Sequence, residues 1–162
     1  MDVSIRLARP REAAIVYRIL MEAYAPYRGK VVPPLKVFES TPASIAVDIR
    51  TRRHAHALAF VGPTPVGTVR CTPGRNGHGQ KRWTLSRLAV LPDYRGEGIG
   101  AMLMRWMEDR ARQCGVVELR GEVRTALPFL VRFYQCLGYQ VLGYRSKPGY
   151  ARYLTIIGKR LR

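Results

Sequence analysis

Acidic residues are scarce in this chain of 162 residues, where 11 aspartates and glutamates stand against 28 lysines and arginines. The formal net charge is therefore +17 at pH 7, and the isoelectric point is about 10.7. Such a charge creates a strong positive field, so we expect an anionic partner. The basic residues are scattered, without the long basic helix or aromatic-interleaved stripe of single-strand binders, and nucleic acid is therefore not the expected partner. A general arginine-rich surface explains the same charge equally well.

Cysteine is rare, and long apolar runs are absent. Cys71, Cys114 and Cys136 are odd in number and form no Cys-x-x-Cys pair, which argues against a disulfide framework and against a zinc site. No apolar run approaches the ~20 residues needed to span a bilayer, and residues 1–6 lack a signal-peptide pattern. We therefore expect a cytoplasmic protein that requires neither a membrane nor a metal.

The length and the hydrophobic fraction of 47% suit a single domain over residues 1–162. Periodicity and turn residues predict strands over 3–9, 55–61, 66–71, 83–90, 116–123, 139–144 and 151–157. They predict helices that begin at Pro10, at Pro42 after a Thr41 cap, after Gly98, and near Pro128. The resulting order, βααβββαβαββ, indicates a mixed sheet with helices packed on it.

Three glycines within five residues, Gly96, Gly98 and Gly100, join a strand directly to a helix. Glycine permits a tight turn, a positive φ and close approach of a ligand to the backbone. The first N–H groups of the helix have no intrahelical partner and carry the positive end of its dipole. Arg95 adds a charge-assisted donor. This layout predicts a cradle for a phosphate or pyrophosphate.

The helix after the cradle is expected to be amphipathic. Its predicted buried positions are Ile99, Met102, Leu103, Trp106 and Met107. Its predicted solvent-facing positions are Arg105, Glu108, Asp109 and Arg112.

Two common phosphate-binding motifs do not fit the glycine turn. A Walker loop needs Lys and then Ser or Thr after its last glycine, but Ile99 follows Gly98 and Ala101 follows Gly100. A dinucleotide-binding fold carries its glycines in the first strand–helix unit, whereas this turn lies beyond the midpoint of the chain.

The spacing Arg95-x-x-Gly98-x-Gly100 matches instead the pattern Arg/Gln-x-x-Gly-x-Gly/Ala. The segment before it reads Leu88-Ala89-Val90-Leu91-Pro92-Asp93-Tyr94, and a later segment reads Phe133-Tyr134-Gln135-Cys136-Leu137-Gly138-Tyr139. With both blocks in this order and spacing, the chain resembles the GNAT superfamily of acyl-CoA-dependent N-acyltransferases. The resemblance is specific over residues 83–144 and looser before them.

The resemblance implies a GNAT-like α/β fold, with a central, mostly antiparallel sheet in which the strand before the cradle splays from its neighbour. It implies acetyl-CoA as cosubstrate, acetyl being the default acyl group, and no metal. Backbone groups on the splayed strand would pair with the pantetheine arm and polarise the thioester. The expected cofactor-binding residues are Leu88, Ala89, Val90, Arg95, Gly96, Glu97, Gly98, Ile99, Gly100 and Ala101.

Tyr134 matches the family tyrosine that often protonates the leaving thiolate, so it is the candidate general acid. The alternative is a packing aromatic on an amphipathic helix. Two departures from the family pattern concern the base and the cofactor contacts: residues 82–87 contain no Glu, and Leu127 stands where many relatives carry Asn. Glu122 is the candidate base, acting through a water. Glu39, His54 and His56 are the other candidates.

Acceptor contacts in such folds usually come from the loop after the first helix and from the last hairpin. The candidate substrate-binding residues there are Tyr24, Tyr27 and Arg145. The leading hypothesis is therefore direct transfer of an acetyl group from acetyl-CoA to a primary amine, of a small molecule or of a protein. The alternative is a module on the same fold that senses acyl-CoA, or holds a polyanion, without turnover. A homodimer is compatible with both, since related proteins often pair through their C-terminal strands.

Overall fold

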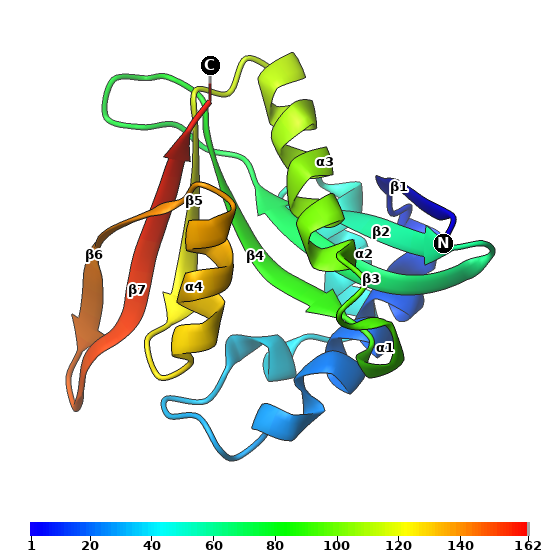
Figure 1. The fold of residues 1–162 in the computed structure, drawn as a ribbon, viewed down its shortest axis with the longest axis horizontal. Coiled ribbons are helices and arrows are strands. Elements are labelled where there is room, and N and C mark those ends of the chain that lie inside the picture. Colours follow the sequence, from blue (N-terminus) through cyan, green and yellow to red (C-terminus); the bar gives the residue numbers. More distant parts are fainter. Residues whose placement is uncertain (162) are drawn as a thin grey trace.

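A seven-stranded mixed sheet lies at the centre of the structure, a computed structural model that describes residues 1–161 (Figure 1). The strands are β1 (Val3–Leu7), β2 (Ala55–Val61), β3 (Thr64–Thr72), β4 (Arg82–Val90), β5 (Glu118–Arg124), β6 (Gln140–Lys147) and β7 (Tyr150–Arg160). The α-helices are α1 (Ala13–Tyr24), α2 (Pro42–Arg50), α3 (Ile99–Gln113) and α4 (Pro128–Cys136). The predicted order βααβββαβαββ is confirmed, with some boundaries shifted by a few residues.

The spatial order of the strands is β1-β2-β3-β4-β5-β7-β6. Every neighbouring pair is antiparallel except β4 and β5, which run parallel. A parallel pair requires a crossover connection, and α3 supplies it. The mostly antiparallel mixed sheet expected from the resemblance is therefore confirmed.

The strands β4 and β5 separate part-way along their length. Residues 82–85 pair with residues 118–121, after which β5 continues beside β7 as far as Arg124. Residues 86–90 of β4 have no partner in β5. Figure 1 shows the two strands diverging on the way to the loop that follows α1. The splayed strand pair is confirmed, and it leaves an opening in the middle of the sheet.

A bulge interrupts β4 within the splayed stretch. Thr68 of β3 lies opposite Ala89, and Arg70 lies opposite Ser86, so two residues of β4 face one residue of β3. One of these two, Arg87, has φ = 52°. A non-glycine residue in the left-handed region is strained, and such strain collects at functional sites.

Two layers of helices cover the sheet, and each encloses its own core. The helices α3 and α4 cover one face, while α1 and α2 cover the other. Side chains of β2 alternate between the two cores, with Ala57 and Ala59 beneath α3 and Leu58 beneath α1. The rigid sheet thus holds any residue near the opening between two packed layers.

The predicted burial of α3 needs two corrections. Met102 is exposed, whereas Glu108, expected to face solvent, is only 3% exposed. One carboxylate oxygen of Glu108 accepts a hydrogen bond from the Tyr139 hydroxyl at 2.8 Å, and the other lies 3.0 Å from Lys159 Nζ. These two partners, Tyr139 just after α4 and Lys159 in β7, make burial of the charge tolerable.

Across residues 1–161, no helix is long and apolar enough to span a membrane.

Candidate active site

A cavity of about 540 Å³ occupies the opening between β4 and β5. Its wall includes Met104 and Tyr134 from the α3–α4 layer, and Tyr24 and Val37 from the layer that contains α1. The cavity therefore crosses the sheet, so that two molecules can approach each other from opposite faces.

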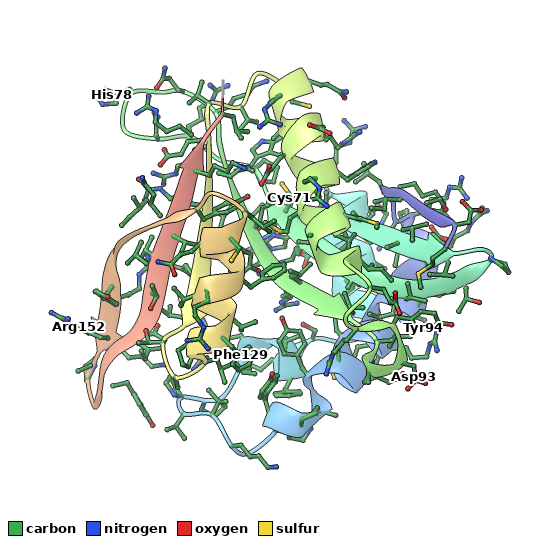
Figure 2. The ribbon with its side chains drawn as sticks, viewed as in Figure 1. Cys71, His78, Asp93, Tyr94, Phe129 and Arg152 are labelled. Atoms are coloured by element: carbon green, nitrogen blue, oxygen red, sulfur yellow. The ribbon has the colours of Figure 1, made fainter. Side chains whose placement is uncertain are left out.

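The glycine turn stands at the N-terminus of α3, where a Cβ added at Gly100 would lie 3.8 Å from the side chain of Leu88 in the cavity wall. Figure 2 shows Asp93 and Tyr94 on the turn that leads into the helix. Gly96 and Gly98 both have φ = 80°, and Gly98 is the N-cap, without any capping side chain. Within residues 1–161, no protein acceptor receives the N–H groups of residues 96–101. A row of free donors at a helix N-terminus is suited to a pyrophosphate.

The space above the turn also fits a close ligand. A Cβ added at Gly96 would meet nothing within 4 Å, and one at Gly98 would meet only the Met102 side chain at 4.0 Å. At Gly100 the same atom would lie 3.5 Å from the Phe133 ring. The residues present therefore fit the phosphates of coenzyme A, which would be held by the backbone of residues 96–101.

Arg95 takes a different part from the expected one. Its guanidinium donates to the carbonyl of Val90 at 3.2 Å and to the carbonyl of Ala23, in α1, at 3.0 Å. The side chain thus clamps the turn between β4 and α1 and is not free in the cradle. Sequence spacing identified the position, but the partner in α1, which lies 72 residues away in the chain, was not visible from it.

The splayed strand carries the expected backbone edge. Ala89 and Val90 pair with β3 on one side, and their other side faces the opening. The carbonyl of Leu88 accepts a hydrogen bond from the Tyr24 hydroxyl at 2.9 Å. Desolvation in the cavity wall raises the pKa of Tyr24 to about 12, so this hydroxyl stays protonated and fixes the strand.

Tyr134 lies on α4 and lines the cavity. Its ring packs edge-to-face on Phe133, with centroids 5.1 Å apart, and on Tyr139, with centroids 5.8 Å apart. Desolvation raises the pKa of the Tyr134 hydroxyl, and Tyr24 raises it further. Among residues 1–161 the hydroxyl has no hydrogen-bond partner. Packing therefore fixes the ring while a protonated hydroxyl faces the cavity.

Glu122 and Arg145, predicted separately as base and substrate contact, lie together. Arg145 Nη1 is 2.6 Å from a carboxylate oxygen of Glu122, and both residues line the cavity. The carboxylate is about one-third exposed, so water reaches it.

The other candidates fall into two groups. Tyr27 and Glu39 do not line the cavity, and the Tyr27 ring packs 6.3 Å from the Tyr24 ring. His54 does line it, with Nδ1 at 2.7 Å from Thr72 Oγ1, and desolvation together with Arg70 lowers its pKa.

The structure contradicts the prediction made for His56. Only 1% of it is exposed, neither ring nitrogen has a hydrogen-bond partner within the described residues, and desolvation lowers its pKa to about 3. The expectation that it titrates near neutrality is wrong, because burial favours the neutral ring.

Sequence reasoning missed Arg70 and Arg87, which line the cavity on the α1–α2 side. The sequence did contain a signal for them, because both are charged residues inside predicted strands whose other residues are mostly apolar. Whether an arginine in such a strand has an acidic partner depends on the tertiary fold.

In the part of the chain that the structure describes, no group of three His, Cys, Asp or Glu side chains is placed to hold a metal ion.

Comparisons of sequence and of fold both match the chain to acetyltransferases. The model of the Acetyltransferase (GNAT) family matches residues 15–139. The chain is 30% identical over 104 residues to "Uncharacterized N-acetyltransferase YjcF" of Bacillus subtilis, and the match covers 64% of this chain and 69% of that protein.

Two solved structures share the fold over nearly their whole length. The PaiA N-acetyltransferase from Thermoplasma acidophilum, solved in complex with coenzyme A, has a TM-score of 0.78 at 20% identity, with 99% of each chain covered. The ribosomal-protein-S18-alanine N-acetyltransferase from Escherichia coli has a TM-score of 0.73 at 18% identity, with 99% of this chain and 94% of that chain covered. At these identities the likeness concerns the fold.

Proposed function

The chain belongs to the acetyltransferase (GNAT) family and is an acetyl-CoA-dependent acyltransferase, and from this premise we propose that it transfers the acetyl group directly to a primary amine. The observation that carries the proposal is the cavity that crosses the sheet where β4 and β5 separate, with Tyr134 in its wall. Acetyl-CoA supplies an activated acyl group as a thioester, and the amine nitrogen must reach its carbonyl carbon.

The donor side is formed by α3, α4 and the splayed edge of β4. The free N–H groups of residues 96–101 would hold the pyrophosphate. The edge of residues 88–90 would pair with the pantetheine arm and align the thioester carbonyl with a backbone donor. Coenzyme A bound to the similarly folded PaiA protein supports this assignment. The side chain of Leu127, in place of the family Asn, is apolar and offers no hydrogen bond.

Proton transfer is assigned to two residues of the cavity wall, Tyr134 and Glu122. As the C–N bond forms and the C–S bond breaks, Tyr134 donates its proton to the departing thiolate. Its raised pKa keeps that proton in place until it is needed. Glu122 accepts the amine proton through a water, since its carboxylate is partly solvated at the cavity wall. His54 is a second base in reach of the cavity, because its lowered pKa leaves the imidazole neutral at pH 7.

Direct transfer is favoured over an acyl-enzyme. No cysteine lines the cavity within the described residues. Cys71 lies beneath α3 (Figure 2), and burial raises its thiol pKa to about 12, so that it carries no reactive thiolate.

The test is calorimetric titration of acetyl-CoA into the wild type, Gly98→Arg and Gly115→Arg. Both glycines have φ near 80° and stand at opposite ends of α3, so the two variants carry similar backbone strain and the same added charge. We expect one-to-one binding in the wild type and Gly115→Arg, and loss of binding in Gly98→Arg. Release of free thiol only in the presence of an amine would establish turnover. Binding without turnover would favour the sensing module, and equal loss in both variants would contradict the cradle.

A further inference from the structure

We propose that the acceptor amine also carries a carboxylate or a phosphate, and that Arg70 and Arg87 bind this anionic group. This inference rests on the proposed transferase function and names the substrate class of the same cavity. It starts from two guanidinium groups, on adjacent strands, that have no carboxylate partner within the described residues.

Arg70 and Arg87 use only a small part of their hydrogen-bonding capacity. Arg70 Nε donates to Ser86 Oγ at 3.0 Å, and Arg87 Nη1 donates to Ser40 Oγ at 2.7 Å. Each guanidinium has five N–H donors, and both side chains line the cavity. The remaining donors therefore face space that a ligand can occupy.

The two arginines line the same cavity, and the charge of Arg87 acts on Arg70. Desolvation, followed by the charge of Arg87, lowers the pKa of Arg70 to about 10. Desolvation also lowers the pKa of Arg87. Asp48 acts on both arginines, and Glu39 acts on Arg87, only at a distance; within the described residues neither carboxylate forms an ion pair with them. Half-buried cations without a counter-ion destabilise a fold, so their presence in a cavity indicates a ligand that supplies the counter-charge.

The backbone adds an independent observation. Arg87 occupies the bulge of β4 with φ = 52°, and the bulge turns this residue out of the regular alternation. A strained arginine next to Leu88, whose carbonyl is held by Tyr24, places a cation beside the strand edge assigned to the thioester.

The charge balance of the whole wall supports an anion. The basic side chains that line the cavity are Lys36, Arg53, Arg70, Arg87, Arg120, Arg124, Arg145 and Lys147. The acidic lining side chain is Glu122, which already pairs with Arg145. A polyamine would meet repulsion here, whereas a molecule with one amine and one anionic group would have its charge matched. Bidentate binding by arginine suits carboxylate and phosphate alike.

The first arm of the test measures selectivity in turnover with acetyl-CoA. The substrates are two matched pairs, O-phosphoethanolamine with ethanolamine and 4-aminobutyrate with 4-aminobutanamide. We expect kcat/KM to be at least about tenfold higher for the anionic member of a pair, in line with charge-assisted hydrogen bonds. Arg70→Gln and Arg87→Gln should lose this preference and keep the KM for acetyl-CoA. Arg18→Gln is the control, since it removes an arginine that is paired with Glu22 and lies outside the cavity wall.

The second arm measures binding without turnover. O-phosphoethanolamine and 4-aminobutyrate are titrated into protein saturated with coenzyme A, while the Nε–Hε NMR signals of Arg70 and Arg87 are followed. Saturable shifts of both signals in the wild type, together with loss of the shift of the remaining arginine in each glutamine variant, support the proposal. Circular dichroism should show folded variants, because each substitution removes a like-charge repulsion.

The two arms separate the inference from the function beneath it. Coenzyme A binding with no anion-dependent shift, or an equal preference for neutral amines, overturns the anionic acceptor and leaves the transferase intact. If coenzyme A does not bind and no thiol is released, the transferase fails. The same titration into the free protein then decides whether Arg70 and Arg87 form an anion site.

Discussion

Replacing His56 with leucine should make the protein more stable and less sensitive to acid. The imidazole is 1% exposed, and both ring nitrogens lack a hydrogen-bond partner within the described residues. Each buried, unpaired polar group costs about 1–3 kcal/mol, and leucine fills a similar volume without that cost. At about pH 7.5 we expect the free energy of unfolding to rise by about 1–2 kcal/mol.

The change in the free energy of unfolding with pH can be predicted more closely than its value at one pH. In the unfolded chain the imidazole binds a proton below its ordinary pKa of about 6.5, whereas in the folded protein desolvation holds the pKa at about 3. Between these values the unfolded state binds more protons, so stability falls as the pH falls. From about pH 7.5 to about pH 5, His56 alone should remove about 2 kcal/mol. His56→Leu should lose less stability over this interval by the same amount.

The assay is urea unfolding of the wild type, His56→Leu and His78→Gln at both pH values. His78 lies exposed at the tip of the loop between β3 and β4 (Figure 2), so its replacement controls for loss of an imidazole. Other titrating groups cancel in the comparison of the variants. Parallel pH profiles for the wild type and His56→Leu would refute the reasoning, since they would mean that His56 is hydrated or paired.

Three further predictions concern catalysis, acid stability and the α3 layer. Tyr134→Phe should lower kcat at least about tenfold and leave the Kd of acetyl-CoA within about twofold. A thiol-release assay measures kcat and calorimetry measures Kd, and an unchanged kcat would remove Tyr134 from proton transfer. Arg6 holds the pKa of Glu12 at about 2, so Glu12→Gln should cost about 1–2 kcal/mol at neutral pH, with the gap to the wild type closing as the pH falls from about 4.5 to about 2 in thermal melts. Lys159→Met should cost about 2–4 kcal/mol by leaving Glu108 buried without its cation, and chemical denaturation of this variant beside Glu108→Leu/Lys159→Met should show partial recovery in the double variant.

Most of the fold, and the backbone geometry of the glycine turn, could be predicted from the sequence. The strands and helices follow from local periodicity, and the cradle follows from Gly96, Gly98 and Gly100, whose backbone freedom acts within the segment itself. Thr41 could likewise be identified as a cap, and its hydroxyl accepts from the Ser44 N–H at 3.0 Å. In each case the determining contact lies within a few residues.

The errors and omissions concern contacts between distant segments. Glu108 is polar by helical periodicity, but its burial depends on Lys159, which lies 51 residues further along the chain. Arg95 was expected to face a phosphate, but a carbonyl of α1 takes its guanidinium. The unpaired state of Arg70 and Arg87 depends on which carboxylates the fold brings near them, and a single sequence does not contain that information.

The opening through the sheet has a consequence for how such a protein can diversify. In the proposed reaction, donor and acceptor approach from opposite faces. Substitutions in the loop after α1 and on the neighbouring ends of β3 and β4 would then change the binding of the acceptor while the surroundings of acetyl-CoA remain unchanged. Libraries confined to that face should yield new selectivities without loss of thioester affinity. A duplicated copy of this chain would therefore keep its binding of acetyl-CoA while its selectivity for the acceptor diverges.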